Sequence, residues 1–276
     1  MTNIILEIAK IGSSASSMFM CLSPAPSMLK IHRRKACGEV VVLPLLSLWG
    51  NCHLWMLYGY LTENIFPVFL TFGTGELLAI AYLIVYYRHT SERAEVRRLA
   101  SWIFAGLLLV TLYALSGDFM LGITSQSKKS TSVVVGYIAV TVCLLLFASP
   151  LATLRRVIQT KSAASFPILM CVVGFFGNSL WVTYGAMIDD MFMCLSNVVC
   201  VALGFVQIVV YIIYNPNKIA NHEGKELLEV VVASPNSNTS TEEADAGSGA
   251  SDSDDSTSAA ATGFYVMRSP RSSATA

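Results

Sequence analysis

Apolar runs of about 20 residues recur along most of the chain, and short polar connections separate them. A helix needs roughly 20 apolar residues to cross the hydrocarbon core of a bilayer. The pattern therefore predicts an all-α membrane protein with seven transmembrane helices, at residues 5–29, 40–61, 66–87, 99–120, 132–154, 166–187 and 191–214. The span over 5–29 is diluted by Ser13, Ser14, Ser16 and Ser17. Small residues of this kind favour packing against other helices over contact with lipid.

Composition agrees with a membrane protein and excludes several other classes. Apolar residues make up 54% of the chain and charged residues 13%, whereas a soluble domain carries about 25% charged residues. The formal net charge is zero, which argues against a nucleic-acid-binding protein. The seven cysteines show no CxxC spacing, so we expect neither a metal site nor a disulfide framework, and no cofactor.

The connections indicate how the chain is oriented. Basic residues gather in the connections after the first, third and fifth spans, and the alternate connections are mostly acidic; only Lys128 and Lys129 depart from this pattern. The positive-inside rule then predicts an outside N-terminus and a cytosolic C-terminus. Glu7 and Lys10 precede the first apolar stretch, so we expect that span to stay in the mature protein. The Ser-, Asp- and Glu-rich composition of residues 215–276 predicts a disordered cytosolic tail.

The chain contains an internal repeat. Ser23-Pro24 recurs as Ser149-Pro150, and each proline is followed at the same distance by a lysine, Lys35 or Lys161. Pro44 and Pro167 then stand near the start of the next span in each copy, and Trp55-x-x-Tyr58-Gly59 recurs as Trp181-x-x-Tyr184-Gly185. Two consecutive units of three membrane-spanning helices would have opposite orientations. One extra helix between them makes the two units parallel. The repeat therefore predicts a 3+1+3 parallel arrangement, with bundles at 5–87 and 132–214 and a linker helix at 99–120.

These motifs resemble the SWEET family of sugar transporters over about residues 5–214. The match rests on LSPAP at 22–26, VVLP at 41–44, WMLYG at 55–59, ASPLATLRRVIQTKSAASFP at 148–167, WVTYG at 181–185, and SNVVC with the following Leu203-Gly204 and Gln207. The resemblance implies a bidirectional uniporter that moves a small sugar by alternating access. We accordingly expect a multi-pass protein of the plasma membrane. Its expected partners are sugar, membrane lipid and further copies of the chain in a homo-oligomer.

The resemblance assigns roles to several residues. Pro24, Pro44, Pro150 and Pro167 match prolines that kink helices as hinges. Trp181 and Asn197 match substrate contacts, since an indole face packs on the C–H face of a sugar and an amide hydrogen-bonds hydroxyls. As the repeat mate of Trp181, Trp55 should face the same cavity. The expected extracellular gate consists of Tyr58, Gly59, Tyr184, Gly185 and Asp190.

The sequence departs from the family at Phe72, where the first bundle usually supplies a second asparagine. Phe72 cannot hydrogen-bond a sugar hydroxyl, which puts sugar recognition in question but not the transport architecture. Glu76 lies four residues later on the same helical face, and an acid at this depth is a candidate polar contact or proton site. An acid hydrogen-bonded between helices is the competing interpretation. His53 is expected to be a packing residue.

The sequence also bears on three other functions. A seven-helix receptor is disfavoured because receptors do not repeat their first three spans in the last three. A transport-dead relative that acts in interaction or trafficking stays open because of Phe72. A proton-coupled transporter of another small polar solute stays open because of Glu76. An enzyme is not expected, since no P-loop or catalytic triad is visible in the sequence.

Overall fold

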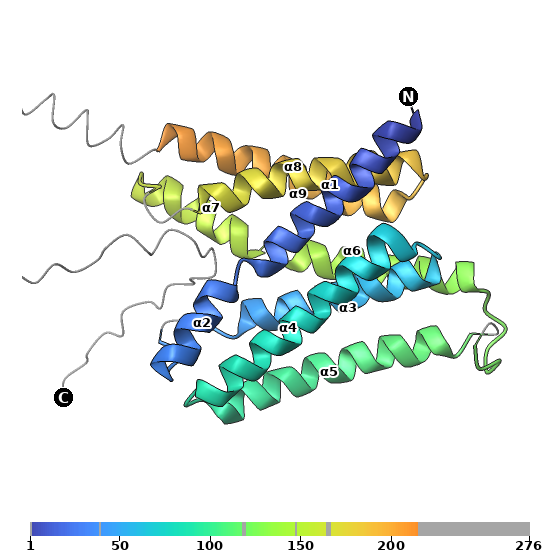
Figure 1. The fold of residues 1–276 in the computed structure, drawn as a ribbon, viewed down its shortest axis with the longest axis horizontal. Coiled ribbons are helices and arrows are strands. Elements are labelled where there is room, and N and C mark those ends of the chain that lie inside the picture. The colour runs from blue at the N-terminus through green and yellow to red at the C-terminus, as the bar shows by residue number, and fades with distance from the viewer. Residues whose placement is uncertain (1, 39, 118–119, 147, 164–166, 215–276) are drawn as a thin grey trace, which may run out of the picture.

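The computed structural model describes residues 2–38, 40–117, 120–146, 148–163 and 167–214, and these residues form a bundle of helices joined by short connections (Figure 1). The predicted disordered tail, residues 215–276, lies outside the described residues, as does Asp118 in the connection before the fifth predicted span.

The described helices follow the predicted order of three, one and three spans. The first unit contains α1 (Thr2–Leu22), α2 (Ala25–Arg34), α3 (Leu43–Leu61), the π-type segment η1 (Ile65–Phe69) and α4 (Leu70–His89). A single helix follows, α5 (Arg93–Leu115). The second unit contains α6 (Lys128–Leu146), α7 (Ala148–Thr160), α8 (Ile168–Met187) and α9 (Met191–Ile213).

Packing between the units is reciprocal. Within the first unit α4 contacts both α1 and α3, and within the second unit α9 contacts both α6 and α8. Between the units, α1 packs on α8 and α3 packs on α6. The first long helix of each unit therefore packs on the second long helix of the other, as two parallel copies related by a two-fold axis would. The linker α5 packs on α3 and α6. The 3+1+3 fold is thus confirmed, while the domain bounds stay a prediction.

The backbone repeats the same two features in each unit. Lys35 and Lys161 both have a left-handed conformation, with φ of 57° and 50°, after the short helices α2 and α7. Glu63 and Asp189 have φ of 59° and 57° after α3 and α8. A left-handed residue is a common way to end a helix. Because Glu63 and Asp189 are as far apart in the chain as Lys35 and Lys161, the four residues mark equivalent positions of the repeat.

The four prolines fall into two classes. Pro24 separates α1 from α2, and Pro150 lies near the start of α7. Pro44 is in the first turn of α3, and Pro167 directly precedes α8. At the start of a helix proline removes no helical hydrogen bond. Pro44 and Pro167 therefore stand where helices begin, and the role of the four prolines as hinges stays a prediction.

The helices are those of a multi-pass membrane protein. Within the described residues, six helical stretches are long and apolar enough to cross a membrane, namely Ile4–Arg34, Ile65–His89, Arg93–Leu115, Lys128–Thr160, Ile168–Met187 and Met191–Ile213. The remaining predicted span, 40–61, corresponds to α3, which is not among these stretches and packs against α4, α5 and α6. In contrast, α5 leaves Trp102 and Leu109 75% and 69% exposed. Side chains of this kind suit contact with lipid.

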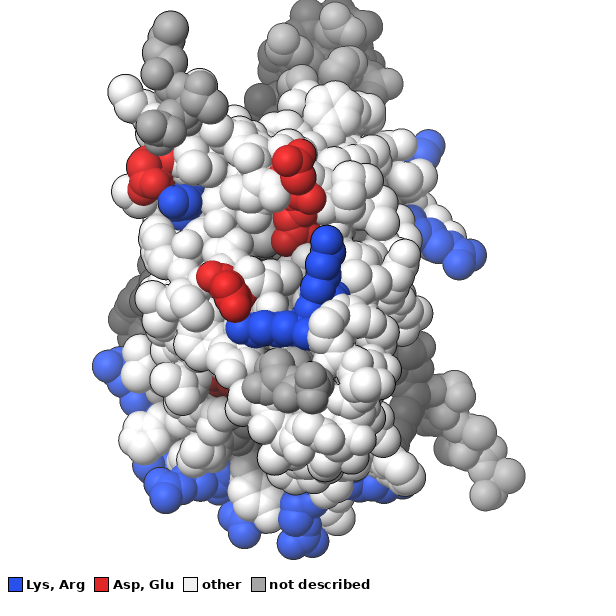
Figure 2. Space-filling model, turned by 90° about the vertical axis from the view of Figure 1, so that its right-hand side faces the viewer, with Lys and Arg blue, Asp and Glu red and all other residues white. Residues whose placement is uncertain are grey.

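The two ends of the bundle differ in charge. We call the end with Thr2 and the connections after α3 and α8 the N-terminal end, and the end where α2, α4 and α7 finish the basic end. Figure 2 looks onto the N-terminal end, where acidic and basic side chains gather on an otherwise largely uncharged surface. Lys128 pairs there with Glu63, with 3.0 Å between Nζ and Oε1. This ion pair explains how Lys128 can lie at an end where the charge pattern disfavours lysine.

Gly59 provides a test of the packing between α3 and η1. A Cβ atom at Gly59 would lie 2.8 Å from both the backbone nitrogen of Phe69 and Cγ1 of Val68. Because the backbone cannot move aside as a side chain can, we expect Gly59→Ala to lower the free energy of unfolding by ~1–3 kcal/mol. The measurement is the thermal unfolding midpoint in detergent. Gly106→Ala is the matched control, since a Cβ at Gly106 meets nothing within 4 Å. Equal midpoints would contradict the close approach.

Candidate functional site

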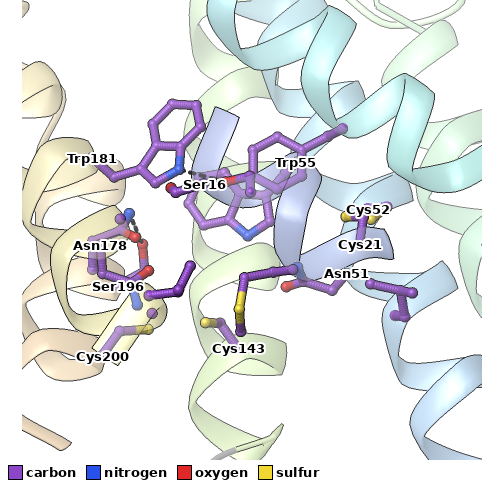
Figure 3. Close-up of a pocket in the computed structure, with 18 of the residues that line it drawn as sticks. Ser16, Cys21, Asn51, Cys52, Trp55, Cys143, Asn178, Trp181, Ser196 and Cys200 are labelled. Atoms are coloured by element: carbon purple, nitrogen blue, oxygen red, sulfur yellow. Dashed lines mark hydrogen bonds between the residues drawn. The ribbon is translucent and has the colours of Figure 1, made fainter. Parts of the chain in front are cut away.

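A cavity of about 370 Å³ lies between the two units. Its volume is within the range of small-molecule pockets, ~300–1,000 Å³. Residues from α1, α3 and α4 of the first unit and from α6, α8 and α9 of the second line it. It extends toward the basic end as far as Ser23 and Pro167. Figure 3 shows the labelled side chains around this space.

All four predicted substrate contacts line this cavity: Trp55, Phe72, Trp181 and Asn197. Trp181 donates its indole N–H to Oγ of Ser17 at 2.8 Å, which fixes the orientation of the ring. Asn197 donates from Nδ2 to the backbone oxygen of Met193 at 2.8 Å. The amide oxygen of Asn197 is then the group suited to accept a hydrogen bond from a ligand hydroxyl.

Two further asparagines, which the sequence interpretation missed, line the cavity. Asn51 lies on α3, four residues before Trp55, and Asn178 lies on α8, three residues before Trp181. These spacings place each amide on the same helical face as its tryptophan, a signal that could have identified both. In Figure 3 Asn178 and Asn51 lie on opposite sides of the cavity. Within the described part of the chain, neither amide has a hydrogen-bond partner, so both are available to a polar ligand.

Phe72 occupies an unexpected position between the two tryptophans. Its ring stacks on Trp55 with 6.1 Å between centroids and on Trp181 with 5.7 Å. Trp55 meets Tyr58 edge to face at 5.6 Å, and Trp181 meets Tyr184 in the same way at 6.0 Å. We call these five rings the aromatic row. The row is symmetric about Phe72, with one Trp-Tyr pair from each unit on either side.

The tyrosines at the ends of the aromatic row join the two units. The Tyr58 hydroxyl donates to the Asp190 carboxylate, 2.9 Å from each oxygen. The Tyr184 hydroxyl donates to Oδ1 of Asn64 at 3.0 Å. Asn64 and Asp190 directly follow the left-handed residues Glu63 and Asp189, so the two contacts are repeat mates. The sequence interpretation named Asp190 but missed Asn64, which the repeat could have identified. Together the two contacts join the units at the N-terminal end.

The predicted gate glycines lie within the units rather than between them. Gly59 packs on Val68 and Phe69 of η1, and Gly185 packs on Met193 and Cys194 of α9. Gly59 thus allows α3 to approach η1 closely, and Gly185 allows α8 to approach the start of α9. They therefore fix where Asn64 and Asp190 stand, while the tyrosines make the contact across the units.

Glu76 does not line the cavity, so the expected polar contact with a ligand is not available from this side chain in this structure. Its Oε1 atom lies 2.9 Å from Nδ1 of His53 and 3.3 Å from Nε1 of Trp49. A residue four positions along a helix is rotated by about 40°, which is enough to direct Glu76 away from the side that Phe72 presents. His53 also contacts Thr111 of α5 and is therefore more than a packing residue.

The two tyrosine contacts should hold the N-terminal end closed to different degrees. A hydrogen bond to a carboxylate contributes ~1.5–3 kcal/mol and one to a neutral amide ~0.5–1.5 kcal/mol. Tyr58→Phe should therefore shift the closed-to-open ratio by roughly 10- to 150-fold, and Tyr184→Phe by less. The measurement is the distance distribution between spin labels at Glu63 and Asp189, in a variant without the native cysteines. Tyr60→Phe is the control, since the Tyr60 hydroxyl donates to Sδ of Met120 and, among the described residues, to no group of the other unit. Unchanged distributions in Tyr58→Phe would contradict the closing role.

Comparisons with known proteins agree with this geometry. Residues 10–94 and 133–219 match the family model described as "Sugar efflux transporter for intercellular exchange". The chain is 32% identical over 217 residues to the bidirectional sugar transporter SWEET1b of Oryza sativa subsp. japonica, covering 75% of this chain and 78% of the relative. It is 29% identical over 237 residues to the sugar transporter SWEET1 of Drosophila pseudoobscura pseudoobscura, covering 84% and 99%.

A solved structure of a eukaryotic SWEET transporter has the same fold. The two structures superpose with a TM-score of 0.67 at 21% sequence identity, covering 77% of this chain and 98% of the other. The family match falls on the two three-helix units and omits most of α5. Together with the repeat, the cavity and the family match, this likeness identifies the chain as a member of the SWEET family of sugar transporters.

Proposed function

We propose that this protein is a bidirectional facilitative sugar transporter, a uniporter that works by alternating access. The observation that carries the proposal is the cavity between the two units, which is closed at one end by the two tyrosine contacts and extends toward the other. Rocking of the units would break these contacts and open the N-terminal end. Relatives described as bidirectional sugar transporters support the proposal.

We further propose that the N-terminus is outside and that the protein resides in the plasma membrane. The basic residues in the last turn of α2, at the end of α4, at the start of α5 and in α7 support this orientation. In this orientation the closed N-terminal end faces the outside and the cavity extends toward the cytosol, so the structure represents an inward-facing state. The tail would then be cytosolic, and assembly into a homo-oligomer stays a prediction.

The cavity suggests how a sugar is held. The indole faces of Trp55 and Trp181 suit the C–H face of a pyranose ring. The amides of Asn51, Asn178 and Asn197 suit its hydroxyls, since an amide oxygen accepts and an amide nitrogen donates. Most other lining residues are apolar or carry sulfur, such as Met20, Cys52 and Cys200. A substrate with a few hydroxyls placed near the second unit therefore fits better than one that is charged.

The position of Phe72 favours one alternative function, that of a transport-dead relative. Its ring stands between the two tryptophans, where it limits the space for a sugar to insert between them. For transport the substrate must either bind on the side of the aromatic row that faces the basic end or displace the Phe72 ring from between the two tryptophans. A chain in which neither happens would retain the fold and act through other proteins.

Replacing Phe72 distinguishes these two functions. Phe72→Asn removes the central ring and supplies an amide, so we expect the apparent affinity for the transported sugar to tighten by ~1 kcal/mol, about fivefold. Phe72→Leu is the matched control, since it removes the ring without adding a hydrogen-bonding group. The measurement is uptake of labelled hexoses and sucrose in transport-deficient cells, at equal surface expression.

Whereas Phe72→Asn adds an amide to the cavity, Asn197→Ala removes one. We expect Asn197→Ala to weaken sugar uptake, because the amide oxygen that could accept a hydrogen bond from a sugar hydroxyl is lost. If the parent and every variant take up neither hexose nor sucrose, the uniporter proposal fails. If only Phe72→Asn transports, then Phe72 makes the parent inactive.

The proposed orientation can be tested separately with epitope tags at the two ends of the chain. We expect an N-terminal tag to bind antibody on intact cells and a C-terminal tag to bind it only after permeabilisation. A C-terminal tag that is accessible on intact cells would show that the positive-inside interpretation is wrong, whatever the protein transports.

A further inference from the structure

The cavity between the two units is rich in sulfur. Four of the seven cysteines line it, together with three methionines: the cysteines are Cys21, Cys52, Cys143 and Cys200. All of these thiols are free. Thiols and thioethers are soft ligands, whereas the hydroxyls of a sugar exchange hydrogen bonds with amides and other hydroxyls. Sugar binding therefore does not account for the sulfur atoms, and they indicate a second kind of ligand.

The four thiols form two pairs, and each pair joins two helices. Cys143 on α6 contacts Cys200 on α9, and Cys21 on α1 contacts Cys52 on α3. Figure 3 shows the sulfur atoms of each pair close to each other at the cavity. The members of a pair are far apart in the sequence, so the absence of a CxxC motif gave no sign of them.

The two pairs differ in how accessible they are. Cys21 and Cys52 are 6% and 1% exposed. A Cβ atom at Gly75 of α4 would lie 3.0 Å and 2.9 Å from their sulfur atoms, so α4 covers this pair closely. Cys143 and Cys200 are only half-buried. A ligand that enters the cavity therefore reaches the Cys143–Cys200 pair first.

A pair of thiols selects one class of metal ion. Zn²⁺ and Ca²⁺ need more ligands than a pair supplies, and the described part of the chain has no group of three or more His, Cys, Asp or Glu side chains that could hold an ion. Cu(I) prefers sulfur, and two sulfur ligands in a linear arrangement satisfy it. The described residues therefore favour Cu(I) over the harder divalent ions.

The charges of such a complex balance. One thiol loses its proton to solvent as its sulfur forms a bond to the metal, and the second thiol binds through a sulfur lone pair. The single thiolate then cancels the positive charge of Cu(I). An uncharged complex is the one that a largely apolar cavity accommodates at least cost, since an uncompensated charge in such surroundings is expensive.

We propose that Cys143 and Cys200 form a binding site for one Cu(I) ion in the wall of the cavity. The ion enters from the basic end, toward which the cavity extends. This site goes beyond the proposed uniport, because it needs no sugar. One consequence does rest on the proposed function: a bound ion occupies part of the cavity, so Cu(I) should lower the uptake of sugar.

The test measures how much Cu(I) the purified full chain takes from the coloured chelator bicinchoninate, in detergent, with ascorbate to keep the copper reduced. We expect the parent to take one equivalent per chain. Cys143→Ser and Cys200→Ser should each lose this uptake, because serine has nearly the size of cysteine but no sulfur. Cys143→Ala and Cys200→Ala repeat the measurement without a hydroxyl, and thermal unfolding midpoints show which variants are folded.

The chain offers two matched controls. Cys171 lies on α8 and Cys194 on α9, and neither is among the residues that line the cavity in the described part of the chain. Cys194 instead donates to the backbone oxygen of Val182. Cys171→Ser and Cys194→Ser should therefore take up the same equivalent of Cu(I) as the parent.

Three results would overturn the proposal. A parent that takes no Cu(I) from the chelator would show that the site does not exist. Unchanged uptake in folded variants of Cys143 and Cys200 would show that this pair does not hold the ion. Equal losses in Cys171→Ser and Cys194→Ser would show that Cu(I) binds any thiol of the chain. The assay contains no sugar, so a chain that binds Cu(I) and transports nothing contradicts the proposed function alone.

Discussion

The structure depends on one constraint: two similar three-helix units must pack their inner faces against each other within a membrane. Tyr58 of the first unit reaches Asp190 of the second, and Tyr184 of the second reaches Asn64 of the first. These reciprocal contacts hold the units together at the N-terminal end, and the aromatic row lies directly behind them. The cavity exists because the same faces are not in contact on the other side of the row.

Much of this arrangement was predictable from the sequence, because the repeat carries it. The paired Trp-x-x-Tyr-Gly motifs and the equally spaced prolines specify two copies, and the extra span between them specifies parallel units. The resemblance to the family predicted Trp181 and Asn197 at one cavity, and the repeat added Trp55 as the mate of Trp181. A local rule also explains why α1 and α2 are separate helices, since Pro24 stands at the N-cap of α2.

Contacts between residues distant in sequence were not predictable in this way. Phe72 was interpreted as a lost hydrogen bond, and only the folded structure reveals a ring stacked between two tryptophans. Glu76 and His53 were interpreted separately, because nothing local shows that α3 and α4 bring them within 2.9 Å of each other. Both cases depend on the rotation of one helix against another, which a difference of one residue changes by about 100°.

The central claim is that movement of the two units opens one cavity alternately to each side of the membrane, without an energy source. The most direct measurement is counterflow in proteoliposomes, in which vesicles loaded with unlabelled hexose are placed in labelled hexose. The account predicts transient accumulation of label with no ATP, no ion gradient and no pH difference, and equal exchange in both directions. Accumulation that requires an imposed proton gradient would contradict it, as would the absence of exchange of any hexose or of sucrose.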